Sequence, residues 1–138
     1  MVIQFLNGSF RYGVPRLWLG VVDVRDAAMA HVQAARLPKA NGRYIAVAES
    51  LTLLEIGNLL RVAEFGIPNK LPKGEVSKAL MWLIAPLAGM RRHFVARNVG
   101  CPIYYNNERS KLELGVHYRP PAETFNDHIR QIVADGLL

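Results

Sequence analysis

Short apolar runs alternate with amphipathic stretches along the chain. A β-branched run predicts a strand over residues 20–24, and a longer apolar run predicts a second strand, buried on both faces, over 43–48. Extended pieces are also expected over 67–72, between prolines, and over 103–105. The pattern therefore predicts about four short strands.

Helices account for most of the remaining chain. Residues 1–9 are typical of a helix end, which Asn7-Gly8 stops. Asp26 is expected to cap a helix over 27–36, whose small residues lie on one face with His31. Thr52 and Glu55 have capping-box spacing and open a helix that reaches about residue 65 and stops at Gly66.

Four more helices are expected in the second half. Residues 75–88 are strongly amphipathic, and Pro86 should end or kink this helix. Further helices are expected over 91–99, over the residues from Asn106 or Asn107 to 114, and from Pro121 to about 135. The residues expected to face inward on the first and last of these four helices are Val76, Ala79, Leu80, Leu83, Ile84, Leu87, Phe125, Ile129, Ile132 and Val133.

This alternation of strands and helices indicates an α/β fold in one region, residues 1–138. Four short strands are few for a sheet that is stable by itself. We therefore expect the rest of the sheet to lie on chain outside this sequence. The chain has 51% hydrophobic and 20% charged residues, as is ordinary for a folded globular domain.

The net charge of +6 is dispersed, because residues 1–70 hold 8 Lys and Arg and residues 71–138 hold 9. No basic stripe is interleaved with aromatic side chains, so nucleic-acid binding is not expected. The single cysteine, Cys101, excludes an internal disulfide, and four scattered histidines lack metal-ligand spacing. The longest apolar stretch, 79–88, is about half a membrane span, and no signal peptide opens the chain, so we expect no membrane partner and a cytoplasmic location.

Candidate catalytic groups have structural explanations. One group looks like a catalytic set: Asp23, Arg25, Asp26 and His31. Arg25 can instead pair with Asp23, however, and His31 is expected to be a core histidine whose hydrogen bonds are satisfied. No G-x-x-G-x-x-G motif occurs, and none of the five tyrosines is followed four residues later by lysine. The sequence predicts no catalytic, cofactor-binding or metal-binding residue in this chain.

Three blocks carry a resemblance to a known family. They are Gly13-Val14-Pro15-Arg16 through Val21-Val22-Asp23-Val24-Arg25-Asp26-Ala27-Ala28 and Ala30-His31; Asn41-Gly42-Arg43-Tyr44-Ile45-Ala46-Val47; and Tyr105-Asn106-Asn107 through Ser110-Lys111, Leu114-Gly115 and Tyr118-Arg119-Pro120. In this order they resemble the C-terminal part of the extended short-chain dehydrogenase/reductases, in the dihydroflavonol reductase-like branch.

The resemblance implies that cofactor binding and substrate binding lie on different parts of the parent protein. The Rossmann half, with its Gly-rich turn, its bound NAD or NADP and the catalytic Ser/Thr, Tyr and Lys, would precede Met1. The present chain would be the substrate-binding portion, would bind no cofactor by itself, and would add the strand at 43–48 in parallel to the missing sheet.

Two departures narrow the substrate. Nucleotide-sugar epimerases of the superfamily carry Arg-Asp where this chain has Leu19 and Gly20, and a missing Arg removes a phosphate clamp. This disfavours nucleotide sugars and favours small carbonyl compounds. Dihydroflavonol reductases proper often have a polar side chain at the position of Gly20, so flavonoid-type hydrogen bonding is also disfavoured.

The loop 12–19 is the expected substrate-binding segment, because loops on a rigid scaffold carry specificity. Met81 is added as a pocket-lining candidate with a soft, apolar side chain, although helix packing explains it equally well. The predicted substrate-binding residues are Val14, Pro15, Arg16, Leu17, Gly20 and Met81.

Three functional hypotheses follow. The first is the substrate-binding part of an NAD(P)-dependent reductase of aldehydes or ketones, inactive alone. The second is a truncated interaction protein that docks on a partner, or on a second copy, through the face that the Rossmann half would cover. The third is part of a nucleotide-sugar epimerase or dehydratase.

Overall fold

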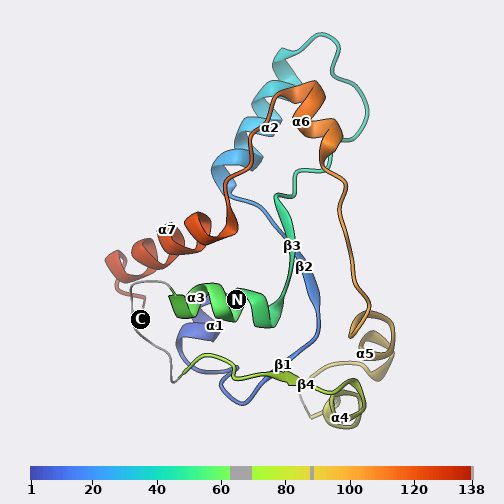
Figure 1. Cartoon of the computed structure of the whole chain (residues 1–138), viewed down its shortest axis with the longest axis vertical. Helices are drawn as coiled ribbons and strands as arrows, with labels where there is room; N and C mark the ends of the chain where they lie inside the picture. Colours follow the sequence, from blue (N-terminus) through green and yellow to red (C-terminus); the bar gives the residue numbers. More distant parts are fainter. Residues whose placement is uncertain (63–69, 88, 138) are drawn as a thin grey trace.

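The computed structural model describes residues 1–62, 70–87 and 89–137. Its elements, shown in Figure 1, are α1 (Val2–Leu6), β1 (Val14–Pro15), β2 (Trp18–Val21), α2 (Val24–Arg36), β3 (Glu49–Thr52), α3 (Leu53–Val62), β4 (Glu75–Val76), α4 (Lys78–Ile84), α5 (Arg92–Asn98), α6 (Glu108–Leu114) and α7 (Pro121–Ala134). The predicted α/β class is confirmed, because about half of the described residues lie in helices and four short strands accompany them.

The four strands form two separate pairs. β2 and β3 are antiparallel, with Trp18 opposite Thr52 and Gly20 opposite Ser50. β1 and β4 are parallel over two residues each. Among the observed strands, only β2 overlaps a predicted one. The overlap with the predicted strand over 20–24 is partial, because the predicted bounds lie too far toward the C-terminus. Residues 67–69 of the expected piece at 67–72 lie outside the described residues.

The expected strand over 43–48 is wrong, as is the one over 103–105. Ser110 Oγ donates to the carbonyl of Ile45 at 2.9 Å, and Asn107 Nδ2 donates to that of Val47 at 2.6 Å. These α6 side chains therefore satisfy carbonyls that a neighbouring strand would otherwise satisfy. A ladder needs such a strand, and the described residues place none beside 43–47.

Local capping signals specify several helix ends. The capping box of α3 is confirmed, because the backbone N–H of Thr52 donates to Glu55 Oε2 at 2.7 Å and that of Glu55 to Thr52 Oγ1 at 3.2 Å. Gly115 ends α6 in the left-handed region, at φ +66°, as expected. The expectation that Asp26 caps a helix at 27–36 is wrong, because Asp23 caps α2 and accepts from the backbone N–H of Arg25 at 2.8 Å.

The main hydrophobic core lies between α1, α3 and α7. Phe5, Ile56 and Ile129 are fully buried there, with Val14 from β1 and Leu51 from β3. Phe125, Ile129 and Ile132 of α7 face inward as expected. Val133 does not, because it lies on the exposed side of that helix.

A second, smaller core joins α4 to α5. Figure 1 shows both helices at the β1–β4 end of the molecule, away from α7. Met81 and Ala85 pack there against Val95 and Val99. The expected helix over 75–88 starts late, at Lys78, because residues 75–76 pair with β1 and Ser77 is the N-cap. Its predicted inward face is right only in part. Val76 and Ile84 pack on this core beside Met81, whereas the side chains at 80 and 83, and at 87 beyond the helix, are exposed.

A third core joins α2 to α6, which lie side by side at the opposite end of the molecule (Figure 1). Ala30 of α2 packs against Leu114 and Val116. A small residue on α2 permits this close approach, as the small-residue face predicted. His31 is not a core residue, because it is exposed and its Nδ1 lies 2.7 Å from the carbonyl oxygen of Ala27.

Candidate functional site

The short β1–β4 ladder brings the predicted substrate loop to the start of α4. Val14 lies opposite Glu75, and Pro15 lies opposite Val76. The Val14 side chain is fully buried in the main core, whereas Pro15 is partly exposed. The ladder thus pairs residues that are 61 positions apart in the sequence, and it ends two residues before α4 begins.

Arg16 connects three segments at this point. Its guanidinium Nε lies 2.6 Å from Glu75 Oε2, forming an ion pair with β4. Its backbone carbonyl accepts from the N–H of Gly100 at 2.8 Å, which holds the residue that follows α5. Arg16 therefore positions the loop against the α4–α5 pair.

Leu17 and Met81 have packing roles. Leu17 packs on the main core, and its carbonyl accepts from the N–H of Leu53 at 3.2 Å, at the start of α3. Met81 is buried between α4 and α5. These packing contacts do not show whether either side chain touches a substrate. Leu17 and Met81 therefore remain predicted substrate ligands.

Gly20 lies under an aromatic ring that the sequence did not associate with it. A Cβ added to Gly20 would come within 2.9 Å of Tyr105 Cε2 and 3.1 Å of Val47 Cγ1. Tyr105 follows α5 by several residues and reaches β2 along the extended segment before α6 (Figure 1). No local spacing relates residues 20 and 105, so sequence reasoning could not pair them.

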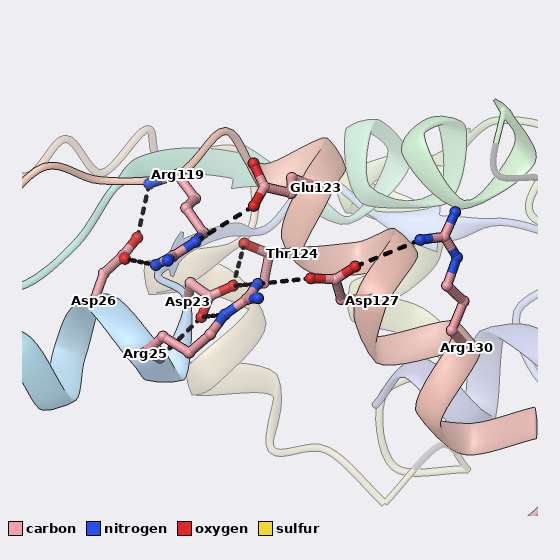
Figure 2. A network of polar contacts seen from close by, with 8 residues as sticks. All are labelled: Asp23, Arg25, Asp26, Arg119, Glu123, Thr124, Asp127 and Arg130. Carbon is pink, nitrogen blue, oxygen red and sulfur yellow. Dashed lines mark hydrogen bonds and ion pairs between the residues drawn. The ribbon is translucent and has the colours of Figure 1, made fainter. Parts of the chain in front are cut away.

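A polar network fastens the N-terminus of α2 to α7 (Figure 2). Asp23 Oδ2 accepts from Arg25 Nη2 at 2.7 Å and from Thr124 Oγ1 at 3.0 Å. Arg25 also bridges to Asp127 Oδ2 at 2.8 Å. The predicted Arg25–Asp23 pair is confirmed, and Thr124 and Asp127 join it from a helix about 100 positions away.

The hydrogen bonds from Arg25 hold the pKa of Asp23 well below its usual range, against the opposing effect of burial. The same carboxylate raises the pKa of Arg25, with a further contribution from Asp127. A carboxylate so firmly ionised and fully bonded is poorly suited to general acid–base work. Asp23 and Arg25 therefore join α2 to α7, whereas Asp26 is not the predicted cap and His31 is not the predicted core residue.

A hollow of about 590 Å³ lies at the C-terminal end of α2. Tyr44 Oη donates to Glu113 Oε2 at 2.8 Å, and Arg109 Nε donates to Glu113 Oε1 at 2.9 Å. Arg109 is the main cause that lowers the pKa of Glu113, followed by Tyr44. Arg109 also donates to Asn41 and to the carbonyl of Arg43, so its guanidinium is largely engaged within the chain.

The turn from β2 into α2 is not suited to the pyrophosphate of a dinucleotide. Pyrophosphate binds at a helix N-terminus that glycines leave open. The turn from β2 into α2 instead places the Asp23 carboxylate on the N–H of Arg25, where its charge repels a phosphate. The chain also lacks the Gly-rich motif.

Neither a metal-ligand cluster nor a membrane-spanning helix occurs in the described ranges. They contain no group of three or more His, Cys, Asp or Glu side chains that could hold a metal ion. They also contain no helix of the length and hydropathy needed to cross a membrane.

Comparison with known proteins connects this fold to reductases. No family model matches the chain. The ketoreductase azaE of Aspergillus niger is 32% identical over 77 residues, which are 55% of this chain and 22% of that protein. The crystal structure of gox2253 matches 99% of this chain and 43% of its own, with a TM-score of 0.73 and 18% identity.

The yeast methylglyoxal/isovaleraldehyde reductase Gre2, in complex with NADPH, matches 99% of this chain and 37% of its own, with a TM-score of 0.63 and 21% identity. The chain spans less than half of each of these proteins. Its fold is that of part of each of these two solved structures, which agrees with the resemblance that the three sequence blocks indicated.

Proposed function

We propose that the chain is the substrate-binding part of an NAD(P)-dependent reductase of small aldehydes or ketones and is not catalytic alone. The observation that carries this proposal is the fold match over nearly the whole chain to less than half of two longer proteins. One of them is a methylglyoxal/isovaleraldehyde reductase that was crystallised with NADPH. The remaining part of such a protein would supply the hydride and the proton.

Substrate contact is assigned to Pro15, Arg16 and Gly20, with Val14, Leu17 and Met81 behind them. The β1–β4 ladder supports this grouping, because it holds the loop against the start of α4. The carbonyl of Arg16 and the N–H of Gly100 tie the same loop to the end of α5. A loop held at both ends is pre-organised to present a few side chains to a ligand.

Docking of the dinucleotide-binding part is assigned to the extended segment 43–48. Carbonyls of alternate residues, Ile45 and Val47, accept from α6 side chains, so α6 holds one edge of this segment. The Ile45 side chain is 44% exposed. An extended, apolar segment has a second edge that can pair with a strand. Segment 43–48 is therefore suited to join the sheet of the dinucleotide-binding part.

The test is a titration of the purified chain followed by ¹H–¹⁵N NMR, first with acetophenone and then with NADPH. We expect acetophenone to shift the amide resonances of residues 16–20 and NADPH to leave the spectrum unchanged. Saturable NADPH binding, or no response to any ketone tested, would contradict the proposal.

A second candidate function, docking on another protein or on a second copy, is favoured by exposed apolar side chains on α4 and just after it. Leu83 of α4 is 61% exposed and Leu87, three residues beyond the helix, is 91% exposed, although the sequence pattern predicts both inside. Exposed apolar patches of this kind mark interaction surfaces. Sedimentation over a wide concentration range, with Leu83→Ser and Leu87→Ser as comparisons, tests it. A chain that stays monomeric throughout counts against self-association.

A further inference from the structure

The two faces of the β2–β3 pair differ in their surroundings. Leu19 and Val21 pack on the main core, so the alternate residues of β2 project to the opposite face. Gly20 is one of these, and Ser50 lies directly opposite it on β3. Directly paired residues of antiparallel strands project to the same side, so Ser50 shares the face of Gly20.

The Ser50 hydroxyl has no hydrogen-bond partner although it is buried, and it is the one such side-chain oxygen or nitrogen in the described part of the chain. Nearby hydroxyls are satisfied: Thr52 Oγ1 donates to Glu55, and Ser110 Oγ donates to the carbonyl of Ile45. Buried polar groups without a partner are rare and destabilising, so they call for an explanation outside the fold.

An aromatic ring covers the glycine on the face of this hydroxyl. Gly20 contributes no side chain, and the place its Cβ would take is filled by Val47 and by the Tyr105 ring at 2.9 Å. Tyr105 is 42% exposed, so its ring borders solvent. Backbone strain does not require glycine here, since Gly20 is not among the residues with positive φ.

We propose that Ser50 is a substrate-binding residue whose hydroxyl bonds a second polar group of the carbonyl substrate, in the space over Gly20 that the Tyr105 ring fills. A neutral hydroxyl both donates and accepts, which suits a substrate hydroxyl better than a phosphate. The inference rests on the proposed reductase function. It names the substrate class as hydroxylated aldehydes and ketones.

A matched pair of ketones tests the assignment. We expect 2-hydroxy-1-phenylethanone to bind the chain about 3- to 10-fold more tightly than acetophenone, as one added hydrogen bond implies. Ser50→Ala should abolish this preference. Ser9→Ala, at an exposed serine, is the control and should keep the preference.

A stability measurement separates ligand binding from a role in folding. Ser50→Ala should not lower the midpoint of thermal unfolding and should raise it by about 3 °C, because it removes an unsatisfied buried hydroxyl. A clear decrease would show that the hydroxyl has a structural partner and would overturn the proposal.

The outcomes of the titration distinguish the two proposals. If both ketones bind with a ratio that Ser50→Ala leaves unchanged, the Ser50 assignment is wrong and the reductase proposal stands. If neither ketone shifts any resonance, both proposals fail.

Discussion

Asp26, in the first turn of α2, binds Arg119, which lies 93 positions later and just before α7 (Figure 2). The backbone N–H of Arg119 donates to Asp26 Oδ2 at 2.7 Å, and its guanidinium pairs with Oδ1. Asp26 is buried, whereas the Arg119 side chain is partly exposed. This pair fixes the direction in which the chain enters α7.

Asp26→Ala should lower the free energy of unfolding by about 2–3 kcal/mol, because it leaves a part-buried backbone N–H without its acceptor. Arg119→Ala keeps that N–H and should cost only about 1 kcal/mol. Urea denaturation measures both, with the exposed partner substitution Glu123→Ala as the control. An Asp26→Ala cost no larger than that of the control would show that the bond contributes nothing.

Acid should weaken the protein through Asp23. The folded pKa of this carboxyl lies below its unfolded value, so its stabilisation is complete above the ordinary pKa, about 4, and is lost as the pH falls toward the lower folded value. Asn is also a good N-cap, so Asp23→Asn removes the charge and keeps the cap. We therefore expect the stability gap between wild type and Asp23→Asn to be constant from pH 7 to 5 and to narrow below pH 4 in urea titrations. A gap that narrows between pH 7 and 5 would contradict this assignment.

Gly57→Ala should destabilise the protein even though alanine favours helices. A Cβ at Gly57, within α3, would meet Pro72 Cγ at 2.7 Å and Phe5 Cε1 at 3.5 Å, and the proline ring has little freedom to move. Overpacking of this kind costs about 1–3 kcal/mol, which exceeds the propensity gain of about 1 kcal/mol. Gly74→Ala is the matched control, because nothing lies within 4 Å of its added Cβ. Equal unfolding midpoints for the two variants would contradict the steric argument.

The Arg16–Glu75 ion pair should matter more for ligand binding than for stability. Both side chains are at least partly exposed, so either truncation should cost under about 1 kcal/mol. Because Arg16 is held by Glu75, we expect Glu75→Gln to weaken acetophenone binding as much as Arg16→Ala does. If only Arg16→Ala weakens binding, Arg16 contacts the ligand directly and does not act by positioning the loop.

The candidate site shows how far sequence reasoning reaches. The family blocks singled out Gly20 and the loop before it, and they also contained Tyr105, but nothing in the spacing indicated that the two residues touch. Ser50 gave no signal at all, because its interest lies in a buried oxygen without a partner. The sequence also did not connect Thr124 and Asp127 with the Asp23–Arg25 pair, because both residues reach this pair from another helix.

The sequence by itself determined the elements whose cause is local. The capping box at Thr52 and Glu55, the left-handed Gly115 and the proline that opens α7 each act within one helical turn, so their spacing is sufficient. Tertiary structure decided what depends on a distant partner. Residues 43–48 form no strand because a ladder needs a neighbour, and α4 buries Met81 because α5 packs on that side alone. A pattern can specify that a face is apolar, but only the packed chain determines which faces are covered.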